Sequence, residues 1–287
     1  MMNGKNVLET MANTYNEMTK SAKKVADYIF EHTKEAQYMS ITSLSEECGV
    51  ADATVSRFCK NLGYDGYNEF KLALAKASGA KVNEPGTEYY EQIDPEDSIQ
   101  VMANKLYASN VAAMKQTLDL LDAAAVDRAV RYMYGAQRVF CFGQGGSGVM
   151  AKEAWARFIT AAPQFQCIED SHLQTMAAAL CTMNDVILFF SYSGATKELV
   201  DTLRPARERG AKVILITHFP KSPAAQFADV ILQCGSKEGP LQGGSVPAKM
   251  SQLLIIDVLF NEFCRANSVF SDANREIVAN AIAAKLL

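Results

Sequence analysis

Apolar residues at helical spacing dominate the first 78 residues. Two sets share the spacing of one helix face: Ala22, Val25, Ala26 and Ile29, and then Val55, Phe58, Cys59 and Leu62. A further helix is expected over about residues 67–77. The pattern therefore predicts an all-α domain at the start of the chain.

After residue 98 the pattern changes to short apolar runs separated by helices. A helical stretch over about 99–134 comes first, and a last long helix is expected over about 248–266. The expected strands lie at 138–142, 165–168, 186–191, 212–217 and 229–233. Strands that alternate with helices of this length pair in parallel through crossover helices. The second part is thus predicted to be a doubly wound parallel-sheet α/β domain.

Residues 79–98 separate these two patterns. Gly79, Pro85, Gly86 and Pro95 interrupt any helical periodicity there. We therefore expect a helical domain over 1–78, a linker over 79–98 and the α/β domain over 99–287.

Two short helices joined by a glycine turn are predicted between residues 41 and 63. Ser43, with Glu46 three residues later, is typical of a capping box at the start of the first helix. Gly49 suits a turn position with a positive φ, and Asp52 is expected to cap the second helix. Gly63 suits the position after its last turn. This arrangement is a helix-turn-helix.

The outer face of the second helix carries side chains that can bind DNA. Thr54, Arg57 and Asn61 follow one another at i, i+3 and i+7, a spacing that puts them on one face. Such groups hydrogen-bond base edges and phosphates from the major groove, but an ordinary solvated helix face carries the same residue types. Because this face occurs on the second helix of a predicted helix-turn-helix, we favour the DNA-binding interpretation. The predicted DNA contacts are Ser43, Thr54, Ser56, Arg57, Lys60 and Asn61.

A glycine-rich loop follows the first expected strand. Residues 143–148 read Gly-Gln-Gly-Gly-Ser-Gly, before a helix expected from about residue 149. Glycines let the backbone approach an anion, and the positive end of the helix attracts it. Gly143, Gly145 and Gly148 also spell G-x-G-x-x-G, and Glu169 follows after the next strand. A dinucleotide-binding domain is therefore an alternative.

A second loop, rich in hydroxyl groups, follows the third expected strand. Ser191, Ser193, Gly194 and Thr196 lie at this strand-to-helix turn, where hydroxyls and N–H groups can hold a phosphate. In isolation such a turn is more often simple capping. Here both loops follow strands of one parallel sheet, at the edge where open α/β folds bind ligands. This favours a ligand with one phosphate and several hydroxyls over a dinucleotide.

The two parts of the chain resemble two known domains. Residues 143–147 and 191–198 resemble the phosphosugar-binding loops of the sugar isomerase (SIS) domain, and residues 44–50 and 53–71 resemble the DNA-binding domain of the RpiR family of bacterial transcriptional regulators. One departure is Ala51, where that family often has Ser. The resemblance implies a phosphosugar site formed by Gly143, Gly145, Gly146, Ser147, Ser191, Ser193, Gly194 and Thr196.

Three further ligand contacts are implied by the resemblance alone. His172 follows the second strand, and Ser245 and Lys249 precede the last long helix, in stretches similar to family segments around the ligand. For His172, a surface histidine at a helix start is the alternative.

Net charge at first argues against nucleic acid. The chain carries 28 Lys and Arg against 32 Asp and Glu, a net charge of −4, whereas DNA-binding proteins usually show a basic excess. Yet residues 53–64 contain Arg57 and Lys60 and no acid. We therefore expect few phosphate contacts and weak non-specific binding.

Composition excludes several other classes. Seven cysteines at wide spacing and three histidines indicate no disulfide framework and no metal centre, and no cofactor is expected. No apolar run approaches the roughly 18 residues that a membrane span requires. A cytoplasmic protein without a membrane partner is expected.

Together these features predict a transcription factor, not an enzyme, that controls genes of carbohydrate or amino-sugar metabolism. The expected partners are near-palindromic double-stranded operator DNA and a sugar phosphate effector, bound by a homodimer or homotetramer. The alternative is a phosphosugar isomerase with an accessory domain. Its acid and base candidates are Glu153, Glu169, Glu198 and His172, whose spacing identifies no catalytic pair.

Overall fold

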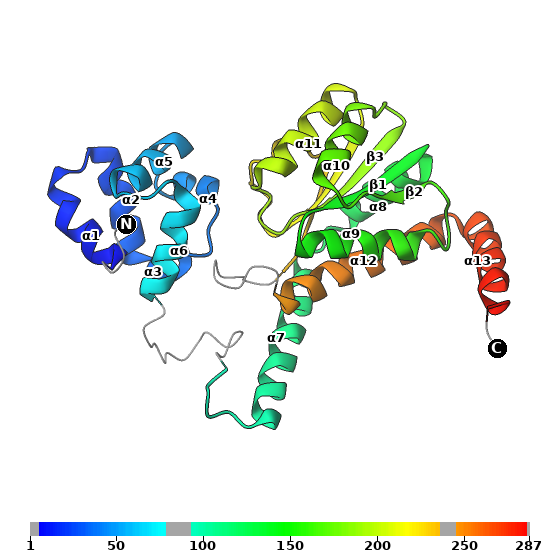
Figure 1. The fold of residues 1–287 in the computed structure, drawn as a ribbon, viewed down its shortest axis with the longest axis horizontal. Coiled ribbons are helices and arrows are strands. Elements are labelled where there is room, and N and C mark those ends of the chain that lie inside the picture. The colour runs from blue at the N-terminus through cyan, green and yellow to red at the C-terminus, as the bar shows by residue number, and fades with distance from the viewer. Residues whose placement is uncertain (1–5, 79–92, 236–244, 286–287) are drawn as a thin grey trace. The chain divides into compact units, whose positions relative to one another are not determined.

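The computed structural model of the 287-residue chain describes residues 6–78, 93–235 and 245–285. The chain forms two compact units, a helical unit and a sheet unit (Figure 1). The helical unit contains α1 (Val7–Thr14), η1 (Tyr15–Glu17), α2 (Lys20–Glu31), α3 (Thr33–Ala36), α4 (Ile41–Glu47), α5 (Asp52–Asn61) and α6 (Tyr67–Ser78).

The core of the helical unit is built from the apolar faces that the sequence predicts. Val25, Ala26 and Ile29 of α2 and Val55 of α5 are fully buried in one cluster. Phe58 of α5 packs edge-on against Phe70 of α6, with 5.6 Å between ring centroids. The all-α prediction for this part is confirmed.

The sheet unit is an α/β fold. Its helices are α7 (Ile99–Asp119), α8 (Ala123–Gly135), α9 (Gly146–Phe158), α10 (Ser171–Ala179), α11 (Lys197–Glu208), η2 (Ala225–Phe227), α12 (Val246–Ala266) and α13 (Ser268–Ala283). Its strands are β1 (Arg138–Gly143), β2 (Phe165–Cys167), β3 (Asp185–Phe190), β4 (Lys212–Thr217) and β5 (Val230–Gln233). They form one parallel sheet in the order β2-β1-β3-β4-β5.

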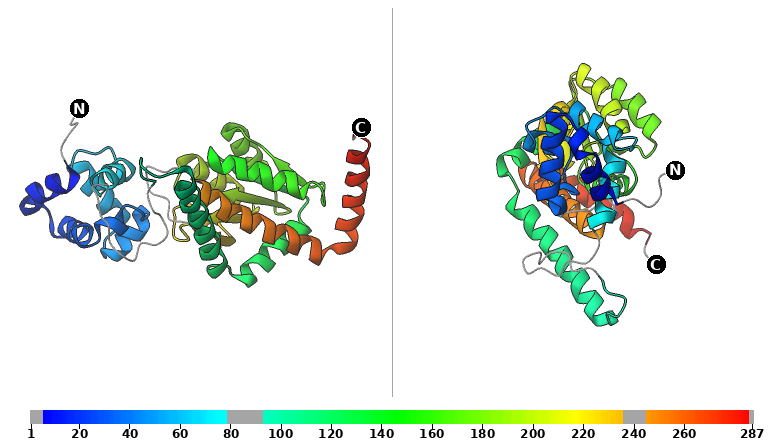
Figure 2. Two further views of the ribbon diagram at one scale, coloured as in Figure 1. Left: turned by 90° about the horizontal axis from the view of Figure 1, so that it is seen from below. Right: turned by 90° about the vertical axis from the view of Figure 1, so that its left-hand side faces the viewer.

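Helices cover both faces of this sheet (Figures 1 and 2). Val139 and Cys141 of β1 pack in a cluster with residues of α8, α9 and α12, whereas Phe140 and Phe142 pack on the other face with residues of α10 and α11. All six residues of β3 are buried, as expected for a central parallel strand. The doubly wound parallel-sheet prediction is confirmed.

Two helical predictions differ from the structure. The stretch expected over 99–134 forms two helices. Asp122 is the N-cap of the second, α8, and its side chain accepts a hydrogen bond from the Ala124 N–H. The helix α13 was not predicted. Ser271 is its buried residue, so α13 needs no apolar stripe that a sequence pattern would reveal. Among the described residues, no helix is long and apolar enough to cross a membrane.

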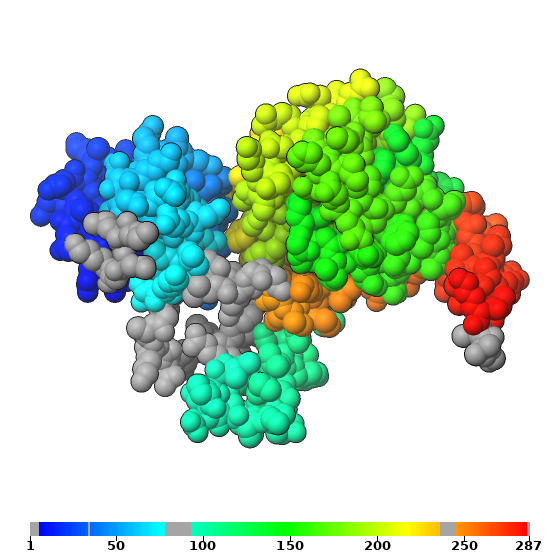
Figure 3. All heavy atoms as spheres, viewed as in Figure 1, coloured from blue at the N-terminus to red at the C-terminus, as the bar shows by residue number. Residues whose placement is uncertain are grey.

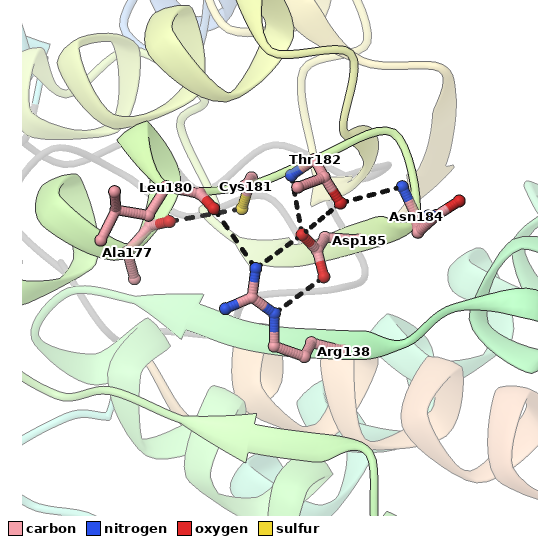
Figure 4. Close-up of polar contacts among 7 residues, drawn as sticks. All are labelled: Arg138, Ala177, Leu180, Cys181, Thr182, Asn184 and Asp185. Carbon is pink, nitrogen blue, oxygen red and sulfur yellow. Dashed lines mark hydrogen bonds and ion pairs between the residues drawn. The ribbon is translucent and has the colours of Figure 1, made fainter.

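An ion pair joins the first residues of β1 and β3 (Figure 4). Arg138 and Asp185 are directly paired in the sheet, and the guanidinium donates from Nη2 and Nε to the two carboxylate oxygens at 2.7 and 2.9 Å. The N–H and hydroxyl of Thr182 also donate to Asp185. Burial raises the pKa of Asp185, but the hydrogen bonds from Arg138 and Thr182 outweigh it and hold this pKa below its usual value.

Candidate functional site

The two phosphate-loop candidates begin side by side at the carboxyl edge of the sheet. Gly143, the last residue of β1, is paired with Phe190, the last residue of β3. The chain leaves β1 toward β2 on one side and leaves β3 toward β4 on the other, so the strand order reverses between them. Ligands of doubly wound folds bind at this point. The register thus brings together loop 1 (residues 143–148) and loop 2 (residues 191–196).

Loop 1 requires glycine for steric reasons. A Cβ on Gly143 would lie 2.6 Å from the backbone oxygen of Ser147, and Gly145 adopts a φ of 54°. This tight turn starts α9 at Gly146, three residues earlier than expected, and places the half-buried Ser147 in its first turn. The positive end of the α9 dipole therefore lies within loop 1.

A buried glutamine holds loop 1 in place by hydrogen bonds. The Gln174 side chain, fully buried on α10, donates from Nε2 to the carbonyls of Gly143 at 3.1 Å and Ile168 at 2.7 Å. Its Oε1 accepts from Nε2 of Gln144 at 2.9 Å. The sequence pattern indicated no role for Gln174, because a single glutamine in a helix does not reveal that both its polar ends are needed by a distant loop.

Loop 2 combines a rigid turn with hydroxyl groups. The buried Ser191 Oγ accepts from the Gly194 N–H at 3.1 Å, and Ser193 Oγ accepts from the Ala195 N–H at 3.3 Å. Gly194 has a φ of 60°. Thr196 is exposed directly before α11, and its side chain does not cap that helix. The hydroxyl-bearing residues Ser193 and Thr196 therefore lie just before the first turn of α11, where an anion site needs hydrogen-bond donors.

The segment after β4 holds loop 2 in place. The Tyr192 carbonyl accepts from the Thr217 hydroxyl and the His218 N–H, both at 3.0 Å, and the Gly194 carbonyl accepts from the Ala224 N–H at 3.0 Å. The His218 ring stacks on Tyr192, with 5.2 Å between centroids. These supports were not predicted, because nothing in a linear pattern connects positions so far apart.

Gly194 in loop 2 has no room for a side chain. A Cβ there would lie 2.1 Å from the Oγ of Ser222. We expect Gly194→Ala to lower the melting temperature and to abolish the shift produced by a phosphosugar. Gly210→Ala is the matched control: its φ of 83° gives a similar backbone strain of about 1–2 kcal/mol, but its Cβ would meet Met183 at an ordinary 3.6 Å. If a phosphosugar shifted the melting temperatures of both variants equally, Gly194 would not be required for the ligand site.

The three ligand contacts implied by resemblance lie outside both loops. His172 is exposed at the second residue of α10, while Lys249 is half-buried in the first turn of α12 and Ser245 immediately precedes that helix. Their part in ligand binding stays a prediction.

Two features oppose the dinucleotide alternative. The strand order is that of flavodoxin-like folds rather than the 3-2-1-4-5-6 order of dinucleotide-binding domains. Glu169, the acid expected to bind a ribose, instead accepts from the Lys152 ammonium at 2.6 Å.

The first helix of the helix-turn-helix begins earlier than expected. Ser40, not Ser43, caps α4, because Ser40 Oγ accepts from the Ser43 N–H at 3.0 Å and Ile41 is already helical. The Ser43 hydroxyl bonds to Ser40 Oγ at 2.8 Å. The capping box predicted at Ser43 is therefore wrong.

Asp52 joins the two helices instead of capping the second. Ala51 is the first flanking residue of α5 and provides no side-chain cap. The Asp52 carboxylate accepts from the Thr42 hydroxyl at 3.0 Å and from the Ser45 hydroxyl, both on α4. The predicted cap at Asp52 is wrong, because these hydroxyls lie within reach only in the folded unit.

The glycine turns are as predicted. Gly49 and Gly63 adopt φ values of 60° and 91°. After α4 the Val50 N–H returns to the Ser45 carbonyl, and after α5 the Tyr64 N–H returns to that of Cys59. Both helices thus end in a Schellman motif, which sets the angle at which α5 leaves the turn.

A polar face of α5 remains open to solvent. Arg57, Lys60 and Asn61 are exposed, and Thr54 and Ser56 are partly exposed, as is Ser43 on α4. Arg57 donates to the Thr54 hydroxyl at 3.4 Å. The opposite face of α5 is buried, so α5 has the two-sided character of a recognition helix.

Comparison with known proteins agrees with both units. Residues 5–81 match the helix-turn-helix domain of the rpiR family, and residues 132–262 match the SIS domain. An uncharacterized HTH-type transcriptional regulator of Haemophilus influenzae is 34% identical over 89% of this chain and 88% of its own length. One from Clostridium perfringens is 31% identical, over 93% and 94%.

Solved structures give the same result. The Vibrio vulnificus NanR protein complexed with ManNAc-6P superimposes with a TM-score of 0.88 at 27% identity, covering 98% of this chain and 100% of that one. The sugar isomerase domain of an RpiR transcription factor from Sphaerobacter thermophilus shares the fold, with a TM-score of 0.57 at 20% identity. Relatives over nearly the full length are regulators, which excludes the isomerase alternative. The chain belongs to the RpiR family of HTH-type transcriptional regulators, with a helix-turn-helix domain followed by a SIS domain.

Proposed function

We propose that this regulator responds to a sugar phosphate bound at the carboxyl edge of its SIS sheet. The observation that carries this proposal is the register of β1 and β3, which starts loops 1 and 2 side by side at the strand-order reversal. The similarity to a NanR protein complexed with ManNAc-6P supports the same ligand class.

In this proposal the phosphate is bound by loop 2 and the start of α11, where hydroxyls and N–H groups converge. The glycines of loop 1 let the ligand approach the sheet edge. The residues assigned to the site are Gly143, Gly145, Gly146, Ser147, Ser191, Ser193, Gly194 and Thr196, with His172, Ser245 and Lys249 contacting the sugar.

The DNA side of the proposal rests on α5. Its exposed face enters the major groove, with contacts from Ser43, Thr54, Ser56, Arg57, Lys60 and Asn61. A homodimer or homotetramer, acting in the cytoplasm, would present two such helices to a near-palindromic operator. By linkage, the effector and the operator change each other's affinity by the same factor. The corresponding coupling free energy is typically about 1–3 kcal/mol.

Removal of two loop hydroxyls tests the ligand site. We expect Ser147→Ala combined with Ser193→Ala to abolish heat of binding in calorimetric titrations with ManNAc-6P and a panel of other sugar phosphates. A ligand at 100 times its dissociation constant stabilises by about 2.7 kcal/mol, so the thermal shift should vanish too.

Ser21→Ala, an exposed serine on α2, is the control and should bind like the wild type. Unchanged affinity in the double variant, or a wild-type chain that binds no member of the panel, would refute the proposed ligand site.

A further inference from the structure

The first half of α7 extends away from the body of the sheet unit (Figures 1 and 3). Along α7 the first buried residue is Ala113, more than halfway through the helix. From there α7 is held tightly, since the Ala113 carbonyl accepts from the Ser251 hydroxyl of α12 and the Thr117 hydroxyl accepts from the Gly235 N–H. Residues 99–112, which we call the α7 arm, precede this anchored part.

The α7 arm exposes an apolar face. Ile99, Leu106, Tyr107 and Val111 follow one another at i, i+7, i+8 and i+12, a spacing that places them on one side of the helix. Ile99 is 81% exposed and Tyr107 is 72% exposed, and the other two are close to half exposed. Contiguous apolar surface of several hundred square ångströms marks an interaction site rather than ordinary solvent-facing surface.

Charge is also missing from this face. Between Ile99 and Met114 the chain contains one charged residue, Lys105, on the opposite side of the helix. Lys105 pairs with Asp97 at 2.9 Å. A helix that faces water permanently carries charges along its exposed side, and a solvated helix of about 12–15 residues is marginally stable without a partner.

An unsatisfied acceptor lies on the same face. Asn110 follows Leu106 and Tyr107 at helical spacing, and its Oδ1 is covered yet accepts no hydrogen bond from any described residue. A covered polar atom without a partner costs about 1–3 kcal/mol, which the Asn110 amide would recover by turning outward to a donor on a second helix. In paired helices a single asparagine at such a position sets the register.

We propose that the α7 arm packs against the α7 arm of a second copy of this chain in a two-fold symmetric contact. An uncharged face is self-complementary, since two copies meet without like-charge repulsion. A small residue on the same face, Ala103, lets the helices approach closely. A specific interface buries about 1,000 Å² or more in total, an area to which each arm contributes its exposed apolar face. The inference assigns a surface to the dimer in the proposed function.

Sedimentation of the full chain without DNA or ligand tests this contact. We expect a wild-type dimer and, for Leu106→Glu, a dissociation constant at least about a hundredfold higher, because the carboxylate would be buried in the contact. Val269→Glu is the control: Val269 on α13 is 88% exposed, against 46% for Leu106, so the same charge enters an open apolar position outside the α7 arm. This control should remain dimeric. A wild-type tetramer that Leu106→Glu reduces to a smaller oligomer supports the proposal equally.

Hydrogen exchange of the α7 arm provides a second measurement. Its amides should be protected in the dimer and exchange rapidly in Leu106→Glu, while those after Ala113 stay protected in both.

A monomeric wild type, or a dimer that dissociates with Val269→Glu but not with Leu106→Glu, would overturn the proposal. The second result would leave the proposed function intact. Conversely, an arm-dependent dimer that binds no sugar phosphate would refute the effector site alone.

Discussion

Asp185→Ala is expected to lower the free energy of unfolding of the sheet unit by about 3 kcal/mol. The variant loses charge-assisted hydrogen bonds worth about 1.5–3 kcal/mol each and leaves Arg138 without its carboxylate at the junction of β1 and β3. The side chain of Asp185 is 1% exposed, so water cannot replace it. The single tryptophan, Trp155 on α9, reports unfolding of this unit by its fluorescence during urea titration.

Asp127→Ala is the control for a solvent-exposed pair. Asp127 and Arg131 form an ion pair one turn apart on α8, where we expect a loss below about 0.5 kcal/mol. Equal losses for the two variants would show that the β1–β3 ion pair adds no more than a surface contact.

The effect of Asp185 should depend on pH. The folded-state pKa is lowered, so the carboxylate contributes stability above its unfolded pKa of about 3.9 and loses it as pH falls through the folded value. The difference between wild type and Asp185→Ala should therefore shrink in acid. A difference that grows as pH falls would contradict the lowered pKa.

Arg57→Ala is expected to weaken operator binding by about 1–3 kcal/mol per half-site without changing the melting temperature. Arg57 is exposed on the outer face of α5 and donates a hydrogen bond of 3.4 Å to Thr54 on the same helix, so its loss should weaken DNA contacts while the buried face of α5 is unchanged. An operator selected by the wild-type chain from random DNA, then titrated by fluorescence anisotropy, measures the loss.

Arg128→Ala removes the same charge from an exposed position on α8 and should bind like the wild type. Equal weakening in the two variants would show a general charge effect and contradict recognition by α5. The same titrations at several salt concentrations should give a shallow slope, because residues 53–64 hold only Arg57 and Lys60 as cations. Affinity falls by about 0.9 log units per phosphate contact for each decade of salt.

Several local features of this protein follow directly from its residue types. Gly49 and Gly63 mark the two turns of the helix-turn-helix because a positive φ is a property of one residue. The strands of the sheet are visible as apolar runs because buried parallel strands need no polar face. The two loop sequences likewise predict an anion site, which stays a prediction.

The packing of the folded chain fixes which of these features lie together and which residues support them. The pairing of Gly143 with Phe190 brings the loops together, and Gln174 and Ala224 hold them by hydrogen bonds from segments distant in sequence. The predicted cap at Asp52 failed for the same reason, since its partners are hydroxyls of another helix. Hydrogen bonds between distant segments depend on packing geometry, and a linear pattern of residue types carries no information about that geometry.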